Sequence, residues 1–210
     1  MQNLKLLKKP ILIIFLVLLL DQIVKVWIKT HMTIGQEYHV FGNWFIIHFT
    51  ENNGMAYGIQ FGENIGKLLL SLFRIVAVGF LIWYIIHLSK KNTPQGIIVC
   101  FSLITAGALG NIIDSAFYGI LFSESTFYDV ARFLPPEGGY STFLHGKVVD
   151  MLYFPLIKNS AGETLFFSPV FNIADSAITI GVLVLLVFYH KFLNSKKQDE
   201  KEPLAEDINK

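Results

Sequence analysis

Apolar positions along the chain fall into four long blocks that are separated by polar stretches. The blocks cover about 10–30, 68–87, 96–118 and 171–190. A helix needs roughly 20 apolar residues to cross the hydrocarbon layer of a bilayer, so each block is long enough to span it. The pattern predicts an all-α membrane protein with four transmembrane helices. A single domain covers 1–194, and we expect the charged segment 195–210 to be a disordered tail.

The first block follows a lysine-bearing segment and therefore looks like a signal peptide. No small-residue cleavage site follows it, and the helical pattern continues through Asp21 and Lys25. We expect this segment to remain uncleaved and to form the first span.

The stretches between the blocks predict two larger connections, 31–66 and 119–170. In the first, the aromatic and β-branched run His39–Phe49 is typical of short strands. A hairpin turn at Asn53–Gly54 would by itself explain the polar residues that follow, and the segment from about 61 to 67 is expected to lie along the membrane surface. The second connection contains a long insertion, 120–147, that has no helical periodicity and predicts an irregular extramembrane loop.

Basic residues predict the orientation of the four spans. With four crossings, eight lysines that flank the blocks fall on one side of the membrane. They are Lys5, Lys8, Lys9, Lys90, Lys91, Lys191, Lys196 and Lys197. The positive-inside rule assigns that side to the cytoplasm, so both termini are expected inside and both larger connections outside.

Composition agrees with a membrane protein and narrows the chemistry. The chain is 53% hydrophobic and 16% charged, whereas soluble domains are about 45–50% apolar and 25% charged. The net charge of +1 gives no reason to expect a nucleic-acid partner. The single cysteine, Cys100, is expected to be a buried, inert thiol. Scattered histidines without an H-E-x-x-H motif argue against a zinc protease, and neither a metal nor an organic cofactor is expected.

Polar residues within the blocks point to one site. Intramembrane ionisable residues are costly and usually functional. In the predicted orientation, polar residues from three spans reach a similar depth below the outer surface, and Asp150 arrives there from the second connection. The polar residues of the three spans are Asp21 and Lys25, Asn111 and Asp114, and Asn172 and Asp175. Asp21 and Lys25 are four residues apart and can pair, either to neutralise each other or to brace the site. The small residues of 106–110 permit close helix contact there.

Two carboxylates in a poorly hydrated site share one proton and titrate as a unit. Such a pair suits peptide hydrolysis, because the ionised member deprotonates water while the protonated member polarises the scissile carbonyl. Asp150 and Asp175 are the candidates, and the amides of Asn52, Asn111 and Asn172 could orient a substrate. A serine nucleophile is not indicated, because no G-x-S-x-G motif occurs.

Five short runs carry a family resemblance. They are Asp21-Gln22 with Lys25, N-x-G-x-A at Asn52, Gly54 and Ala56, G-x-x-G-N-x-x-D at Gly107, Gly110, Asn111 and Asp114, V-V-D at Asp150, and F-N-x-A-D-S at Asn172, Ala174 and Asp175. In this order the chain resembles the bacterial lipoprotein signal peptidases (signal peptidase II), a family of intramembrane aspartyl proteases.

The resemblance implies that Asp150 and Asp175 form the catalytic dyad. The remaining family positions would bind substrate or support the dyad: Asp21, Lys25, Asn52, Gly54, Asn111, Asp114, Asn172 and Ala174. It also implies a small extracytoplasmic β-cradle and an amphipathic helix within 31–66. The implied substrate is a prolipoprotein that is cut before its diacylglyceryl-modified lipobox cysteine, at the outer face of the bacterial inner membrane. The cyclic peptide globomycin would bind at the dyad, and membrane lipid would surround it.

The chain departs from the family pattern at two places. The arginine that usually follows the aspartate of the third-span motif is replaced by Ser115, for which Arg132 is a candidate substitute. The stretch from Asp114 to Asp150 is also unusually long, and its insertion either caps the site, binds a partner or is a passive elaboration.

Two other classes of function compete with a peptidase. A small proton-coupled transporter also uses buried charges, but it needs polar residues along a path across the whole bilayer, and the inner halves of the second and fourth blocks hold almost none. An inactive assembly protein is the other alternative, against which the presence of both Asp150 and Asp175 argues.

Overall fold

A computed structural model describes residues 2–53, 63–91, 93–158, 164–166 and 169–189. Its helices are α1 (Gln2–His31), α2 (Glu63–Ser89), α3 (Gln95–Ile113), α4 (Gly119–Leu121) and α5 (Ile173–Phe188). A π-helical turn, Asp114–Tyr118, joins α3 to α4. The strands are β1 (Glu37–Phe41), β2 (Phe45–Asn52), β3 (Val148–Tyr153), β4 (Ile157–Lys158) and β5 (Thr164–Phe166).

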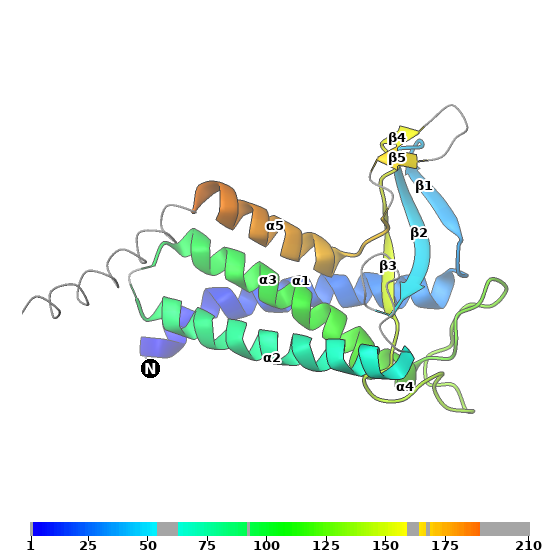
Figure 1. Cartoon of the computed structure of the whole chain (residues 1–210), viewed down its shortest axis with the longest axis horizontal. Coiled ribbons are helices and arrows are strands. Elements are labelled where there is room, and N and C mark those ends of the chain that lie inside the picture. The colour runs from blue at the N-terminus through cyan, green and yellow to red at the C-terminus, as the bar shows by residue number, and fades with distance from the viewer. Residues whose placement is uncertain (1, 54–62, 92, 159–163, 167–168, 190–210) are drawn as a thin grey trace, which may run out of the picture.

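Helices α1, α2, α3 and α5 form a bundle in which α3 contacts each of the other three. The beginning of α1 and the end of α5 lie at the same end of this bundle (Figure 1). Three helical segments are long and apolar enough to cross a membrane: Leu6–His31, Leu68–Ser89 and Gln95–Leu121. The fourth, α5, is apolar but has 16 described residues, so its crossing remains a prediction.

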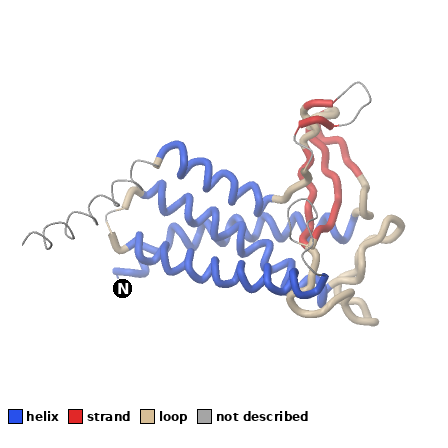
Figure 2. Tube along the Cα trace, in the orientation of Figure 1, coloured by secondary structure: helices blue, strands red, loops and turns tan. Residues whose placement is uncertain are grey.

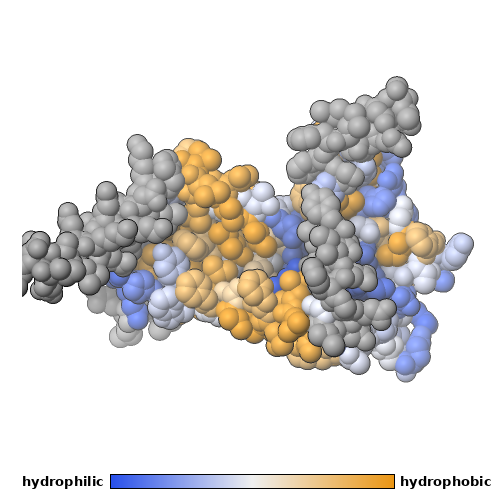
Figure 3. All heavy atoms as spheres, viewed as in Figure 1, coloured by the Kyte–Doolittle hydropathy of each residue, from blue (hydrophilic) through white to orange (hydrophobic). Residues whose placement is uncertain are grey.

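The outward surface of the bundle is apolar. Phe73, Val76 and Phe188 are 70%, 72% and 73% exposed. On the visible face, hydrophobic residues cover the middle of the helices, and hydrophilic residues lie toward both ends, including the end that carries the strands (Figure 3). Large exposed apolar patches are unusual on soluble monomers, so this surface fits a lipid environment.

Small residues let α5 lie close against α3. A methyl group added at Gly107 would come within 2.1 Å of the main-chain oxygen of Ala174. One added at Gly110 would lie 2.7 Å from Asp21 Oδ2, on α1. The close helix contact predicted for this segment is therefore present, and it brings α1, α3 and the start of α5 together.

An antiparallel sheet, ordered β1-β2-β3, stands across one end of the bundle (Figures 1 and 2). We call this the sheet end. The strands expected near His39–Phe49 are confirmed as β1 and β2. Asp150, expected in a connection, lies instead on β3, where it pairs in register with Thr50 of β2. The core beneath the sheet joins α1, β2 and β3 through Ile28, Met32, Phe49, Val149 and Met151.

The insertion 120–147 begins with the last residues of α4 and is otherwise irregular, apart from an isolated bridge between Phe122 and Phe133. It is nevertheless fastened to the core, because Phe122 and Ala131 are buried in the cluster beneath the sheet. Of the segment expected to lie on the membrane surface, residues 63–67 belong to α2. Residues 61–62, the Asn53–Gly54 turn and the tail 195–210 fall wholly or partly outside the described residues.

Candidate active site

Asp150 is a buried carboxylate on β3, with 3% of its surface exposed. Its Oδ1 accepts a hydrogen bond of 2.7 Å from Asn172 Nδ2, and its Oδ2 accepts one from Asn52 Nδ2. Asn52 reaches it because β2 pairs with β3 in antiparallel register. Burial, together with the nearby charge of Asp175, raises the pKa of Asp150 to about 7. Burial therefore favours the protonated form of Asp150 up to about pH 7.

Asp175 lies in the first turn of α5 and is held by a capping box. Asn172 is the N-cap, and its Oδ1 accepts a 2.8 Å bond from the main-chain N–H of Asp175. The main-chain N–H of Asn172 donates in return to Asp175 Oδ2 at 3.3 Å. Asn111 Nδ2 donates to Asp175 Oδ1 at 2.8 Å. The spacing N-x-x-D is a sequence signal for such a cap, although the sequence analysis singled out these two residues as polar groups in an apolar block and not as a cap.

Asn172 therefore contacts both candidate carboxylates, Asp150 through its side chain and Asp175 through its main chain. The same Nδ2 lies 3.1 Å from Asn111 Oδ1 and 3.3 Å from the main-chain oxygen of Val149. Asp150 and Asp175 come from a strand and a helix, yet they share one hydrogen-bonded neighbour. The convergence expected from the sequence is present in the structure.

Lys25 lies at the centre of the supporting network and is fully buried. Its Nζ is 3.0 Å from Asp21 Oδ2, 2.8 Å from Asp114 Oδ2 and 3.0 Å from Asn111 Oδ1. The pairing of Asp21 with Lys25 is confirmed. Because the ammonium also contacts Asn111 of α3 and Asp114 of the π-helical turn that follows, it joins these elements to α1 as well as neutralising Asp21.

The two buried aspartates of this network, Asp21 and Asp114, accept hydrogen bonds from main-chain N–H groups of the residues next to Asp175 and Asp150. Asp21 Oδ1 accepts a 2.9 Å bond from the main-chain N–H of Ala174, in the first turn of α5. Asp114 Oδ2 accepts a 3.2 Å bond from the N–H of Val149, next to Asp150. Asp114 also begins the π-helical turn, a distortion that often occurs at functional sites.

Gln22 belongs to this network, although sequence reasoning gave it no role of its own. Its Nε2 donates to Asp114 Oδ1 at 2.9 Å, and its Oε1 accepts a 3.2 Å bond from the Tyr118 hydroxyl. An amide beside Asp21 within an apolar block was the available signal. Gly54, the remaining family position, lies outside the described residues.

The expectation that Arg132 replaces the family arginine is wrong. Arg132 is 66% exposed and pairs with Glu137 within the insertion. Ser115 is buried and donates to the main-chain oxygen of Asn111 at 3.0 Å. The arginine whose charge acts on the site is Arg74 of α2, which interacts electrostatically with Asp175 and, more weakly, with Asp114 and Asp150.

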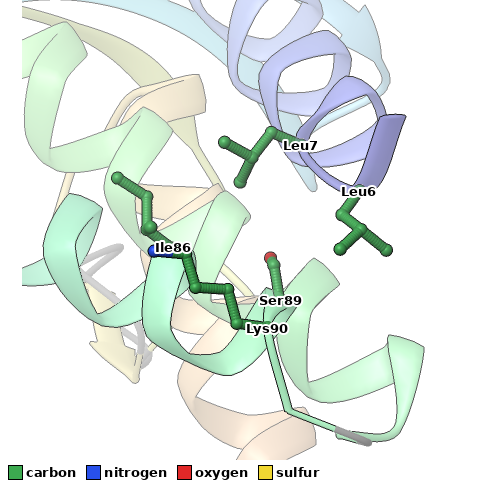
Figure 4. Close-up of a pocket in the computed structure, with 5 residues that line it drawn as sticks. All are labelled: Leu6, Leu7, Ile86, Ser89 and Lys90. Carbon is green, nitrogen blue, oxygen red and sulfur yellow. The ribbon is translucent and has the colours of Figure 1, made fainter. Parts of the chain in front are cut away.

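A small cavity of about 10 Å³ lies at the opposite end of the bundle (Figure 4). Leu6, Leu7, Ile86, Ser89 and Lys90 line it. It offers the space that one water molecule needs, and Leu6 is about 20 Å along α1 from Asp21 at 1.5 Å per residue. It plays no part in the site at the sheet end. No group of three or more metal-binding side chains occurs among the residues that the structure describes.

Comparison with known proteins assigns this arrangement to a family. The family model described as signal peptidase (SPase) II matches residues 13–191. The chain belongs to the signal peptidase II family. It is 48% identical over 204 residues to the lipoprotein signal peptidase of Porphyromonas gingivalis, covering 92% of this chain and 88% of that one. It is 36% identical to the lipoprotein signal peptidase of Amoebophilus asiaticus, covering 83% and 75% of the two chains.

Two solved structures have a similar fold. A bacterial membrane enzyme determined by the in meso method at 2.3 Å has a TM-score of 0.59 and 28% identity, covering 90% of this chain and 91% of its own. A second such enzyme, determined at 1.9 Å, has a TM-score of 0.60 and 29% identity, covering 87% and 93%. The multi-pass membrane fold of this signal peptidase II family member is thus similar to that of bacterial membrane enzymes.

Proposed function

We propose that this chain is an aspartyl endopeptidase that removes signal peptides from prolipoproteins by cutting before a diacylglyceryl-modified cysteine. Membership of the signal peptidase II family makes it a protease of prolipoprotein signal peptides. The observation that carries the aspartyl mechanism is that Asn172 contacts the carboxylates of both Asp150 and Asp175. These two acids are also the aspartates of the V-V-D run on β3 and of the F-N-x-A-D-S run at the start of α5.

The surroundings of the two aspartates favour different roles. Asp150 is buried and its pKa is raised to about 7, so it is the member that holds the shared proton and polarises the scissile carbonyl. Asp175 is half-buried and lies at the N-terminus of α5, where the helix dipole stabilises a negative charge. It therefore takes a proton from the attacking water. Asn111 and Asn172 hold both groups without adding charge.

The substrate approaches this site from the membrane. The dyad lies at the sheet end. The apolar faces of α1, α2 and α5 would contact lipid, so a substrate in the membrane could reach the dyad along them. A diacylglyceryl group on the cysteine would remain among the acyl chains while the peptide bond before it reaches the carboxylates. In this proposal the sheet end faces the outside of the inner membrane, both termini lie in the cytoplasm, and globomycin binds at the dyad.

A proton-coupled transporter is less well supported. Its charged groups would have to continue through the bundle. In the described residues, the core at the other end consists of Ile85, Leu88, Ile97, Ile98, Cys100 and Leu185. Among the described residues, the buried aspartates and lysines of the helices are instead gathered at the sheet end, as a catalytic site requires.

The proposal is tested with a lipobox peptide prepared with and without the diacylglyceryl group and incubated with the purified protein in lipid. We expect cleavage of the lipidated peptide alone, at the bond before the cysteine, with mass spectrometry identifying both products and globomycin abolishing them. Equal cleavage of both peptides would contradict the lipid requirement. No cleavage of any lipidated substrate, combined with proton flux in the same vesicles, would favour the transporter.

A further inference from the structure

A second buried charged cluster lies beside the dyad and has no role in the chemistry described above. Lys29 of α1 is fully buried and forms an ion pair with Glu51 of β2, whose side chain is 4% exposed. Ser125 of the insertion joins both, because its Oγ lies 2.8 Å from Lys29 Nζ and 3.1 Å from Glu51 Oε1. Three parts of the chain that are distant in sequence thus meet at one ion pair.

The surroundings of this cluster are organised around the two charges. The ammonium of Lys29 lies 5.0 Å from the ring centre of Tyr140 and 5.6 Å from that of Phe122, both in the insertion. Lys147, whose side chain is partly exposed, has its Nζ 3.9 Å from Glu51 Oε2. Buried ion pairs are costly to desolvate and are often neutral for stability. A gain in stability is therefore a weak explanation for the buried ion pair of Lys29 and Glu51.

The cluster is connected directly to Asp150. Glu51 precedes Asn52, whose amide donates to the carboxylate of Asp150. Across the sheet, Glu51 pairs in register with Val149, the residue before Asp150. Neighbouring residues of a strand point to opposite faces, so holding Glu51 on one face of β2 fixes the position of Asn52 on the other.

We propose that Lys29, Glu51 and Ser125 form a positioning network that holds Asn52 against Asp150 and connects the insertion to the dyad. This inference rests on the proposed function. It gives the insertion a function, because Ser125, Tyr140 and Phe122 surround the ion pair. None of the three residues of the network touches a substrate in this proposal, so their loss affects turnover more than substrate binding.

The first test compares Lys29→Met with Arg132→Met, which removes an exposed cation of the insertion. Displacement of a catalytic group by about 1 Å can cost roughly 10²-fold in rate. We expect kcat per folded enzyme to fall by about that factor in Lys29→Met with KM nearly unchanged, to fall less in Ser125→Ala, and to stay at the wild-type value in Arg132→Met. Lys29→Arg should recover part of the loss. Wild-type turnover in both Lys29→Met and Ser125→Ala would overturn the inference.

A double-mutant cycle tests whether Lys29 acts through Asn52. If it does, Lys29→Met should add no further loss of kcat to Asn52→Ala, since groups that act as one unit are not additive. Losses that multiply would overturn the positioning role.

Amide hydrogen exchange gives a readout that does not depend on activity. We expect Lys29→Met to speed exchange in β2 and β3 while leaving α2 and α3 protected. Unchanged exchange in these strands would contradict the inference even if the wild-type protein cleaved no substrate. An inactive wild type with faster exchange in Lys29→Met would instead contradict only the proposed function.

Discussion

At the scale of single residues, Asp150 and Asp175 differ in burial and in the groups that bind their carboxylates. Asp150 is buried on a strand and receives two side-chain amides, whereas Asp175 is half-buried in the first turn of a helix. Burial penalises the charged form of Asp150, and the charge of Asp175 adds to that penalty. Both effects favour the protonated form of Asp150, which is the form that the proposed hydrolysis needs at this position.

The activity should accordingly fall as the pH rises through about 7. The raised pKa of Asp150 means that its proton is retained below pH 7 and lost above it, and each further pH unit should then lower kcat about tenfold. Asn52→Ala removes a hydrogen bond that favours the charged form, so it should move this alkaline limb to higher pH. A pH–kcat profile measures both. A wild-type rate that is constant from pH 6 to 9 would contradict the assignment of the proton to Asp150.

At the scale of elements, the site depends on how closely α5 approaches α3. The main-chain oxygen of Ala174 lies where the side chain of any residue larger than glycine at position 107 would begin. The backbone at Ala174 cannot yield easily, because its N–H donates to Asp21 and because it lies within the capping box that Asn172 and Asp175 form. The start of α5 is therefore placed by a glycine and by an aspartate of α1 together.

Gly107→Ala should push the start of α5 away from α3, with a loss of about 1–3 kcal/mol of stability and most of the activity. Gly79→Ala on α2 is the matched control, because an added methyl group there meets no atom within 4 Å. It should be neutral or slightly stabilising, since alanine favours helix more than glycine does. Thermal unfolding in detergent measures both. Equal midpoints for the two variants would show that the contact is unimportant.

The sequence predicted the elements with a strong local pattern and missed those that depend on distant partners. Apolar blocks showed the helices, and the small residues around Gly107 showed the close contact. Val148–Tyr153 is one short strand whose register is set by pairing with β2, so its sequence alone does not reveal it. The π-helical turn at Asp114 gives no local sequence signal either.

The same distinction holds for the candidate site. The carboxylates and amides were found because polar residues are conspicuous in apolar blocks, and their order matched a family. Lys29 and Glu51 were not singled out, because each is an ordinary charge near the end of a helix or strand until the insertion folds over them. Arg132 was chosen by residue type alone, and its partner proved to be Glu137.

At the scale of the whole molecule, the buried charged side chains of the described residues lie at one end of the protein. The buried ionisable groups Asp21, Lys25, Lys29, Asp114 and Asp150 all belong to the network at the sheet end. Sheet and insertion cover this end, and the apolar bundle beyond it suits a membrane (Figures 1 and 3). In the proposed function, this end would lie at the boundary between lipid and water, where Asp150 and Asp175 would cut a lipid-modified peptide.

The most direct test of this account is the cleavage rate of a diacylglyceryl-modified lipobox peptide by Asp150→Asn and Asp175→Asn, with Asp129→Asn as a control on the exposed insertion. Acid–base groups contribute roughly 10²–10⁴-fold each, so each dyad variant should lose at least about 10²-fold in kcat while remaining folded, and Asp129→Asn should match the wild type. Near-normal turnover by either dyad variant would contradict the dyad and leave Asp114 as the next carboxylate to test.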